Sequence, residues 1–419
     1  MSELSFAPLT KFADITMGQS PGVELCNTDG KGLPFLQGCA EFGASNPQAS
    51  VYCAPPLRTA KAGSVLISVR APVGTMNYAD QDYCIGRGLG AFKAKPGLSN
   101  TVFLKHAVEH RSNYLHRRSQ GSTFAAVSTG DVQNIPIPMF PFNKQNKIAA
   151  IFKGMDTSIE KTEALIAKYQ QIKAGLMLDL FTRGLLPNGQ LRPSYDQAPE
   201  LYQETAIGWI PQDWHFTTCS KVCEKIIDCK NRTPPETPDG FPVIRTPNVR
   251  NGVFVDKDLV FTDEHSYFVW TMRGKPQVGD ILITREAPVG EVCMIPERHP
   301  SACLGQRMML YRPNQELIAA QYFLYALQSR QIQNRLDLIS GGSTVGHVRV
   351  GDIRDLWMFM PKSPQEQNQI ASALDAISEK LNCELSQLCK LRQQRIGLMD
   401  DLLTGKVLVR VDALEATYA

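Results

Sequence analysis

The chain lacks any run of apolar residues close to the roughly 18–20 that a membrane-spanning helix needs. Its N-terminus also lacks the basic, apolar and small-residue regions of a secretory signal. Its eleven cysteines are therefore expected to be reduced thiols of a cytoplasmic protein. Charge of one sign is scarce as well, because the formal net charge is only +3. Local patches, and not the overall charge, thus decide whether the chain binds nucleic acid.

The patterns that usually mark catalytic and cofactor sites are missing too. The sequence has no Gly-rich dinucleotide loop after a strand, no Gly-x-Ser-x-Gly elbow and no Asn/Asp-Pro-Pro-aromatic stretch. Residues 341–346, GGSTVG, begin like a phosphate-binding loop, but His347 and Val348 stand where Lys and Ser/Thr are needed. We therefore expect that the chain catalyses nothing by itself and binds no cofactor.

Two groups of residues could suggest a metal site, and neither is expected to hold one. His106 and His110 fit the H-x-x-E-H pattern of a zinc-binding helix. The corresponding stretch in the second half of the chain, YFLYALQSR, has no ligands, which favours a solvated or interfacial helix. Cys219, Cys223 and Cys229 include no Cys-x-x-Cys pair, so they are interpreted as core thiols and not as zinc ligands.

The most informative feature that is present is an internal repeat. GSVLISVRAPVG begins at Gly63 and GDILITREAPVG begins at Gly279, with seven identical positions at an offset of 216 residues. QNKIAAIF and QNQIASAL, which begin at Gln145 and Gln367, match at an offset of 222. GLMLDLFT and GLMDDLLT match at the same offset. Several matches in one order with a nearly constant offset indicate that a whole domain has been duplicated.

Each copy combines a mixed domain with a long helix. Residues 1–142 and about 206–362 alternate short β-branched runs with Gly, Pro and Asn turns, and SVLISV and DILIT are expected to be buried strands. Residues 144–182 and 365–404 have a helical period, and residues 183–205, with three prolines, are interpreted as a connector. We therefore predict an α+β fold of two tandem mixed α/β domains, joined by two long antiparallel helices, with an internal pseudo-two-fold repeat.

Both long helices carry an apolar seam with alternating steps of three and four residues. The seam is interrupted at equivalent places, by Thr162 and Glu384 and then by Lys173 and Arg395. A sustained seam of this kind predicts an intramolecular coiled coil, although each helix could instead pack on its own domain. The predicted seam residues are Ile148, Phe152, Met155, Ile159, Ile166, Tyr169, Leu176, Leu180, Ile370, Leu374, Ile377, Leu381, Leu388, Leu391, Leu398 and Leu402.

Two similar domains held apart by a spacer suit a ligand with two half-sites, and DNA is the leading case. Arg and Lys can read guanine, and Asn and Gln can read adenine, when they lie on loops. Such side chains gather near the turns of both copies, where the two copies differ from one another. The candidates for DNA contact are Arg70, Arg87, Arg117, Arg118, Gln120, Ser122, Thr123, Arg245, Asn248, Arg250, Arg285, Gln306, Arg307, Ser343, Thr344, His347 and Arg349.

The organisation resembles the specificity (S) subunit of type I restriction–modification enzymes over essentially the whole chain. The resemblance rests on the helix endings GLMLDLFTRGL and GLMDDLLTGKV, the helix openings QNKIAAIF and QEQNQIASAL, and IGWIPQDW at residues 207–214. It implies two target-recognition domains, each of which reads one half of a bipartite site in double-stranded DNA. The implied division is target-recognition domain 1 at 1–142, long helix 1 at 143–185, a connector at 186–205, target-recognition domain 2 at 206–362, long helix 2 at 363–405 and a C-terminal tail at 406–419.

The resemblance also implies partners. Two modification subunits, which carry S-adenosylmethionine, would dock on the helices and domains, and a restriction subunit would bring ATP and Mg²⁺. Two other functions remain open: a specificity module of a methylation-only complex, and a two-domain protein scaffold that does not bind DNA.

Overall fold

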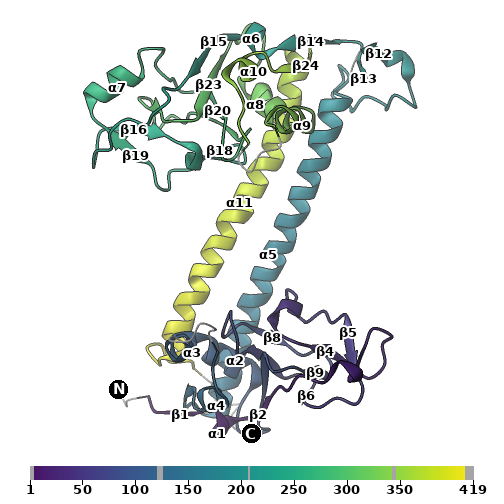
Figure 1. The fold of residues 1–419 in the computed structure, drawn as a ribbon, viewed down its shortest axis with the longest axis vertical. Helices are drawn as coiled ribbons and strands as arrows, with labels where there is room; N and C mark the ends of the chain where they lie inside the picture. Colours follow the sequence, from purple (N-terminus) through teal and green to yellow (C-terminus); the bar gives the residue numbers. More distant parts are fainter. Residues whose placement is uncertain (1–3, 120–125, 206–207, 342–345, 411–419) are drawn as a thin grey trace. The chain divides into compact units, whose positions relative to one another are not determined.

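The computed structural model describes residues 4–119, 126–205, 208–341 and 346–410. The chain forms two compact units: Met1–Ala164 with Leu385–Ala419, and Leu165–Glu384. Two long helices, α5 (Phe142–Thr182) and α11 (Pro364–Leu403), each contribute to both units (Figure 1). The two long helices predicted from the sequence are thus confirmed.

The first unit is built around a four-stranded antiparallel sheet with the order β2-β10-β7-β8. A five-stranded sheet has the order β3-β5-β4-β9-β6, in which β4 and β9 are parallel, and β1 pairs with β11. The strands are β1 (Phe6–Pro8), β2 (Ala13–Met17), β3 (Cys26–Asn27), β4 (Leu33–Leu36), β5 (Val51–Cys53), β6 (Thr59–Ala60), β7 (Val65–Ser68), β8 (Met76–Tyr78), β9 (Tyr83–Ile85), β10 (Leu89–Ala94) and β11 (Pro136–Pro138).

The second unit repeats this topology. Its four-stranded antiparallel sheet has the order β15-β23-β20-β21, β16 and β22 are parallel neighbours, and β14 pairs with β24. The strands are β12 (Tyr202–Thr205), β13 (Gly208–Pro211), β14 (Trp214–Thr218), β15 (Cys223–Asp228), β16 (Phe241–Ile244), β17 (Val249–Arg250), β18 (Val253–Phe254), β19 (Val260–Thr262), β20 (Ile281–Thr284), β21 (Val292–Met294), β22 (Cys303–Leu304), β23 (Met308–Pro313) and β24 (Trp357–Pro361).

Four of the shorter helices recur in both units, and α7 (Glu264–Trp270) is present only in the second unit among the described residues. In the first unit the four are α1 (Leu9–Phe12), α2 (Thr101–His110), α3 (Ser112–Ser119) and α4 (Thr129–Gln133). In the second unit they are α6 (Cys219–Val222), α8 (Ala320–Gln328), α9 (Arg330–Ile339) and α10 (Val350–Arg354). The matched stretches that revealed the repeat form β7 and β20, whose residues are all buried, as expected for central strands. The duplication predicted from the sequence is therefore confirmed by strand order and direction.

The hydrophobic core of each unit is completed by a helix ending from the other repeat. Met399, Leu402 and Leu403, at the end of α11, pack in the same cluster as Phe103 and Phe152 of the first unit. In the second unit, Leu180 and Phe181, at the end of α5, pack with residues of α8 and α11. Full burial of each such side chain contributes roughly 1.5–3 kcal/mol. This exchange explains why the endings GLMLDLFT and GLMDDLLT are so apolar.

A buried glutamine fixes the start of each long helix. Gln145 is 1% exposed, and its amide oxygen accepts from the hydroxyl of Ser99, while its amide nitrogen donates to the carbonyl of Phe140, 2.9 Å away. Gln367 is also 1% exposed and makes the equivalent contacts with the backbone of Ala319 and Pro361. The glutamine of the repeated Gln-Asn dipeptide thus links the start of the long helix, by hydrogen bonds, to the loop before the neighbouring short helix.

The connector after α5 folds tightly onto the second unit. Arg192 is 2% exposed, donates to the carbonyl of Leu185 over 3.1 Å and lies 3.7 Å from the carboxylate of Glu366. Glu366 also accepts from the indole of Trp214 at 3.0 Å. Gly184 is required here, because its φ is +64° and a side chain would collide with the Glu366 carboxylate.

No helix in the described part of the chain is long and apolar enough to cross a membrane.

Candidate functional site: helix pair and arginine-rich turns

The helix pair is antiparallel where both helices meet in the first unit. Arg395 of α11 contacts Asp156 of α5, and Arg392, three residues earlier, contacts Glu163, seven residues later. Every predicted seam residue is buried or half-buried. The buried ones are Ile148, Phe152, Ile166, Leu180, Ile370, Leu374, Ile377, Leu388 and Leu402, and the half-buried ones are Met155, Ile159, Tyr169, Leu176, Leu381, Leu391 and Leu398.

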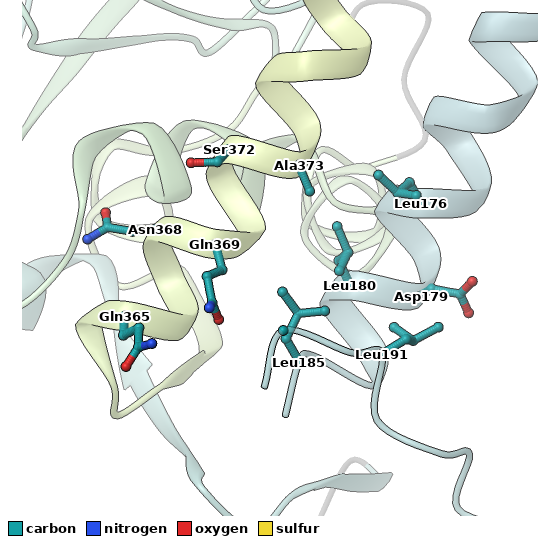
Figure 2. Close-up of a pocket in the computed structure, with 11 residues that line it drawn as sticks. Leu176, Asp179, Leu180, Leu185, Leu191, Gln365, Asn368, Gln369, Ser372 and Ala373 are labelled. Atoms are coloured by element: carbon teal, nitrogen blue, oxygen red, sulfur yellow. The ribbon is translucent and has the colours of Figure 1, made fainter. Parts of the chain in front are cut away.

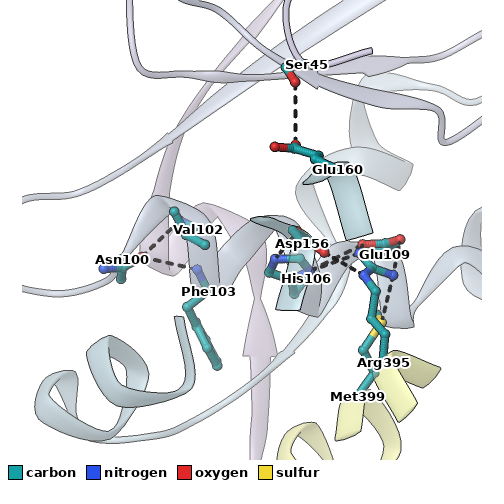
Figure 3. A network of polar contacts seen from close by, with 10 residues as sticks. All are labelled: Ser45, Asn100, Val102, Phe103, His106, Glu109, Asp156, Glu160, Arg395 and Met399. Carbon is teal, nitrogen blue, oxygen red and sulfur yellow. Dashed lines mark hydrogen bonds and ion pairs between the residues drawn. The ribbon is translucent and has the colours of Figure 1, made fainter. Parts of the chain in front are cut away.

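The seam interruption at Arg395 is a buried ionic network (Figure 3). The Arg395 guanidinium lies 2.7 Å from the carboxylate of Glu109 and 2.7 Å from that of Asp156. The fully buried imidazole of His106 lies 3.3 Å from each of these carboxylates. Burial raises the pKa of both carboxyl groups, but the close contacts with His106 and the hydrogen bonds from Arg395 outweigh it and leave each pKa below its ordinary value. Both carboxylates are therefore ionised at neutral pH.

This arrangement decides the interpretation of the H-x-x-E-H pattern. His106 faces α5 and α11, whereas His110 lies 3.7 Å from Asp400. The residues that the structure describes contain no group of three His, Cys, Asp or Glu side chains that could hold a metal ion. Helix α2 is therefore an interfacial helix, which is one of the two alternatives that the sequence favoured.

The second unit has a polar contact at the equivalent place. Lys173 of α5 lies over the ring of Tyr325, 5.6 Å from its centroid, and burial lowers the pKa of this lysine. The Tyr325 hydroxyl donates to Asp375 of α11 over 2.7 Å, and burial is the main cause that raises the pKa of this tyrosine to about 12. The second interruption of each seam thus marks the place where a long helix meets a short helix of the domain that it completes.

A cavity of about 800 Å³ opens between the end of α5 and the start of α11 in the second unit. Figure 2 shows Leu176 and Leu180 on α5, Leu185 and Leu191 in the following loop, and polar side chains such as Gln369 on α11. The lining therefore combines apolar and polar side chains. Such a cavity suits an apolar side chain of a protein partner that is flanked by hydrogen-bonding groups.

The predicted DNA-contacting residues that the structure describes fall into three groups by exposure. Those exposed to solvent are Arg70, Arg87, Arg117, Arg118, Gln306, Arg307, His347 and Arg349. Arg245 and Arg250 are half-buried, and Asn248 and Arg285 are buried. The remaining candidates, Gln120, Ser122, Thr123, Ser343 and Thr344, lie outside the described residues.

Asn248 is placed in the core and not on a reading surface. It is 0% exposed, its amide oxygen accepts from the backbone of Arg245 at 2.9 Å, and its amide nitrogen donates to the carbonyl of Val255 at 3.0 Å. Because its donor and acceptor are both engaged with the backbone, Asn248 stabilises its loop and is unsuited to reading an adenine. Its prediction as a DNA contact is corrected on this ground.

Equivalent backbone contacts tie each Ala-Pro-Val-Gly turn to the segment that follows the short helices. The amide of Val127 donates to the carbonyl of Val69 over 2.9 Å, and the amide of Val348 donates to that of Arg285 over 3.1 Å. Arg70 in the first unit and His347 in the second unit lie at these junctions. Each unit therefore places an exposed nitrogen-bearing side chain, Arg70 or His347, beside the same turn.

Glu286 is a charged residue at the Ala-Pro-Val-Gly turn of the second unit that the sequence analysis did not predict. Its carboxylate lies 2.6 Å from the His347 imidazole and 2.9 Å from the Arg307 guanidinium. The signal that could have revealed it is the repeat alignment, because Glu286 stands where the first copy has Arg70. The two turns therefore differ in charge at one equivalent position.

The three cysteines that were considered as zinc ligands behave as core thiols. Cys219 and Cys229 are buried, Cys223 is half-buried, and burial raises the pKa of Cys219 to about 12. Such a thiol is not ionised at neutral pH and is a poor metal ligand or nucleophile.

Comparison with known proteins identifies the family. The family model for the type I restriction modification DNA specificity domain matches residues 57–171 and 211–390. A protein of Methanocaldococcus jannaschii assigned as the MjaX specificity subunit of a type I restriction enzyme is 36% identical over 172 residues, which span 41% of this chain and 40% of the relative. The MjaIX specificity subunit of the same organism is 22% identical over 84% of this chain and 79% of its own length.

Solved structures show the same fold. The S subunit of a type I restriction–modification system from M. genitalium has a TM-score of 0.62 at 16% identity and covers 96% of this chain and 97% of its own. A chain solved in a study of complex assembly and conformational transition of the type I R-M system has a TM-score of 0.51 at 15% identity, with 97% of this chain and 99% of that chain covered. Together with the matches of the family model to both repeats, these comparisons show that the chain belongs to the specificity (S) subunits of type I restriction–modification systems, which are non-catalytic DNA-specificity components.

Proposed function

We propose that each domain of this specificity subunit reads one half of a bipartite site in double-stranded DNA. The observation that carries this proposal is the placement of exposed arginine and histidine side chains around the same turn in both units, in Arg70 and Arg87 of the first and Arg307 and His347 of the second. The two turns are held by equivalent backbone hydrogen bonds, which fits a common way of entering a DNA groove. Their side chains differ, which fits the recognition of two different DNA sequences.

The helix pair holds the two domains at a set spacing in this proposal. The packing of a helix ending from the other repeat in the core of each unit supports this role of the helices. The gap between the two half-sites is therefore a property of α5 and α11, and the half-site sequences are properties of the turns.

Two modification subunits dock on the ends of the helix pair, and the cavity at the start of α11 is one docking point. The cavity is lined by Leu176, Leu180 and Asp179 of α5 and by polar groups of α11, a mixture of apolar and polar groups that is expected at a protein interface. Ala373 lines it, and the equivalent position in the first unit is Ile151, an exposed apolar residue. The two docking surfaces are thus related but not identical. S-adenosylmethionine then belongs to the modification subunits, ATP and Mg²⁺ to a restriction subunit where one is present, and the complex acts in the cytoplasm.

A docking variant tests the position of the modification subunits. Ala373→Arg places a long charged side chain in the cavity, whereas Ala376→Arg, on the same helix, changes an exposed alanine that does not line it. We expect that Ala373→Arg lowers the number of modification subunits bound per chain, measured by light scattering of the purified complex, and that Ala376→Arg does not. Equal stoichiometry in both variants would place the docking surface elsewhere.

DNA binding is tested with the complex of this chain and its modification subunits. Contacts to several phosphates make affinity fall steeply with salt, so the logarithm of the binding constant should decrease linearly with the logarithm of salt concentration. A preference for one bipartite sequence over random DNA should persist at each salt concentration. Binding that depends on neither salt nor sequence would instead support a protein scaffold that does not act on DNA.

A further inference from the structure

Glu286 contacts two side chains, those of Arg307 and His347, at the tip of the hairpin formed by β20 and β21. One carboxylate oxygen lies 2.6 Å from Nδ1 of His347, and the other lies 2.9 Å from Nε of Arg307. The Arg285 guanidinium lies 3.9 Å from the Glu286 carboxylate. The Glu286 side chain is only 20% exposed, whereas those of Arg307 and His347 are 44% and 50% exposed. The carboxylate is therefore beneath its partners, and the two partner side chains face solvent.

The backbone and the side chain of Arg307 are both held. Its φ is +72°, in the left-handed region that costs a residue with a side chain roughly 1–2 kcal/mol. Its carbonyl accepts from the amide of Arg285 over 2.9 Å. The Glu286 carboxylate contacts Nε, and among the described residues Nη1 and Nη2 of Arg307 make no ion pair. An exposed arginine in a strained conformation, whose terminal donors make no ion pair with the described residues, is arranged for an external ligand.

We propose that Arg307 reads a guanine in the half-site of the second domain and that Glu286 is its positioning residue. This inference rests on the proposed function. The two terminal amino groups of a guanidinium match the N7 and O6 acceptors of guanine in the major groove. A carboxylate bound to Nε fixes the plane of the guanidinium, so less conformational entropy is lost when the base is contacted.

The first domain has no equivalent pair. The amide of Val69 donates to the carbonyl of Gly88 over 3.0 Å, and the amide of Arg285 donates to the carbonyl of Arg307 in the same way. Gly88 therefore occupies the place of Arg307. Arg70 occupies the place of Glu286. Because the first copy has neither the arginine nor the carboxylate at these positions, a change in the pair should affect only the half-site that the second domain reads.

The same domain offers a matched control. Asp256 makes a similar set of contacts, with Arg298 at 2.8 Å and His299 at 2.6 Å. Asp256 lies between β18 and β19, and Arg298 and His299 follow β21, so none of the three belongs to the turn at residues 285–290. Asp256→Asn therefore removes a carboxylate with an Arg and a His partner from another place in the same domain.

The experiment uses the complex of the chain with its modification subunits. DNA duplexes randomised through both half-sites are methylated, and the modified molecules are sequenced. Arg307→Ala should reduce the preference for guanine at one position of one half-site by about 5- to 150-fold, the range for loss of one bidentate base contact. Glu286→Gln should reduce the preference at the same position by a smaller factor, and should have no further effect when Arg307 is already alanine. Asp256→Asn should leave both half-sites unchanged.

Several results would overturn the inference. A uniform loss of methylation across all sequences in Arg307→Ala would make Arg307 a phosphate contact. Unchanged preference in both Arg307→Ala and Glu286→Gln, with a bipartite site still recognised, would refute the pair while leaving the proposed function intact. If the unaltered complex shows no sequence preference, the proposed function itself fails. Thermal unfolding of each variant identifies a loss that comes from misfolding, and Arg307→Lys, which keeps the charge but lacks the planar donor pair, must then show the altered preference.

Discussion

Arg395→Ala removes the cation that holds two carboxylates in the core of the first unit. Glu109 and Asp156 would remain close to one another and to the buried His106 without their shared partner. Loss of one partner from a fully buried ion pair costs about 3–5 kcal/mol. Here the carboxylate side chains are 33% and 27% exposed, so solvent screening reduces the expected cost to about 2–3 kcal/mol in the free energy of unfolding.

Arg392→Ala is the control for this variant. Arg392 is on the same helix, and its pair with Glu163 at 2.7 Å is open to solvent, with 60% and 45% of the side chains exposed. A pair of this kind contributes less than about 1 kcal/mol. All four tryptophans lie between residues 209 and 357, in the second unit, so their fluorescence does not report directly on this network. The suitable assay is urea unfolding followed by circular dichroism, together with hydrogen exchange of the α2 amides.

The pH dependence gives a second check on the same network. The pKa of each carboxyl group is lowered in the folded protein, so their stabilising effect is complete above the ordinary carboxyl pKa of about 4 and is lost as the pH falls below it. The difference in stability between the unaltered chain and Arg395→Ala should be greatest at pH 7 and should narrow below about pH 4. Equal destabilisation by Arg395→Ala and Arg392→Ala, or a difference that does not change with pH, would refute the reasoning.

Three further predictions concern the helices and the thiols. Leu381→Asp, at a half-buried position of the seam, should lower the free energy of unfolding by about 2–3 kcal/mol, measured by thermal or urea unfolding. Glu379→Lys, at an exposed position, should change it little. Equal destabilisation by the two variants would mean that the seam lies on another face of the helix. One heptad inserted at equivalent places of α5 and α11 adds roughly 10 Å to each helix. The preferred gap between half-sites in a methylation library should then widen. An unchanged gap at full affinity would show that the helices do not set the gap. A maleimide at pH 8 should modify the exposed Cys383 and Cys389 before buried thiols such as Cys293, because burial raises the pKa of Cys293 to about 12. Mass spectrometry of digests measures the order of labelling. Early labelling of Cys293 would contradict its burial.

The repeat made much of the fold predictable. Strands β7 and β20 are short apolar runs that end in the same Ala-Pro-Val-Gly turn, so one domain could be aligned with the other before either was seen. The periodic seam likewise identified the two long helices. A period shows which face of a helix is apolar but not what covers it, and for this reason the packing of Leu402 in the first unit and Leu180 in the second could not be predicted.

The reading surface was less predictable, because it depends on loop geometry. Residue type suggested Asn248 and missed Glu286, yet the structure buries the first and joins the second to two exposed side chains. A side chain that reads a base and one that holds a loop use the same donors and acceptors, so only the positions of neighbouring atoms distinguish them. The same limit applied to Arg395, which sequence showed as an interruption of the seam and the structure shows as an ionic contact.

The measurement that tests the central claim most directly is to map the bases methylated by the complex on DNA of random sequence. If each domain reads one half-site, the modified molecules will share two short specified blocks separated by an unspecified gap of constant length. Exchange of residues 206–362 for the corresponding domain of another specificity subunit will then change one block and leave the other block and the gap unchanged. A single continuous motif, or a change in both blocks after this exchange, would contradict the account.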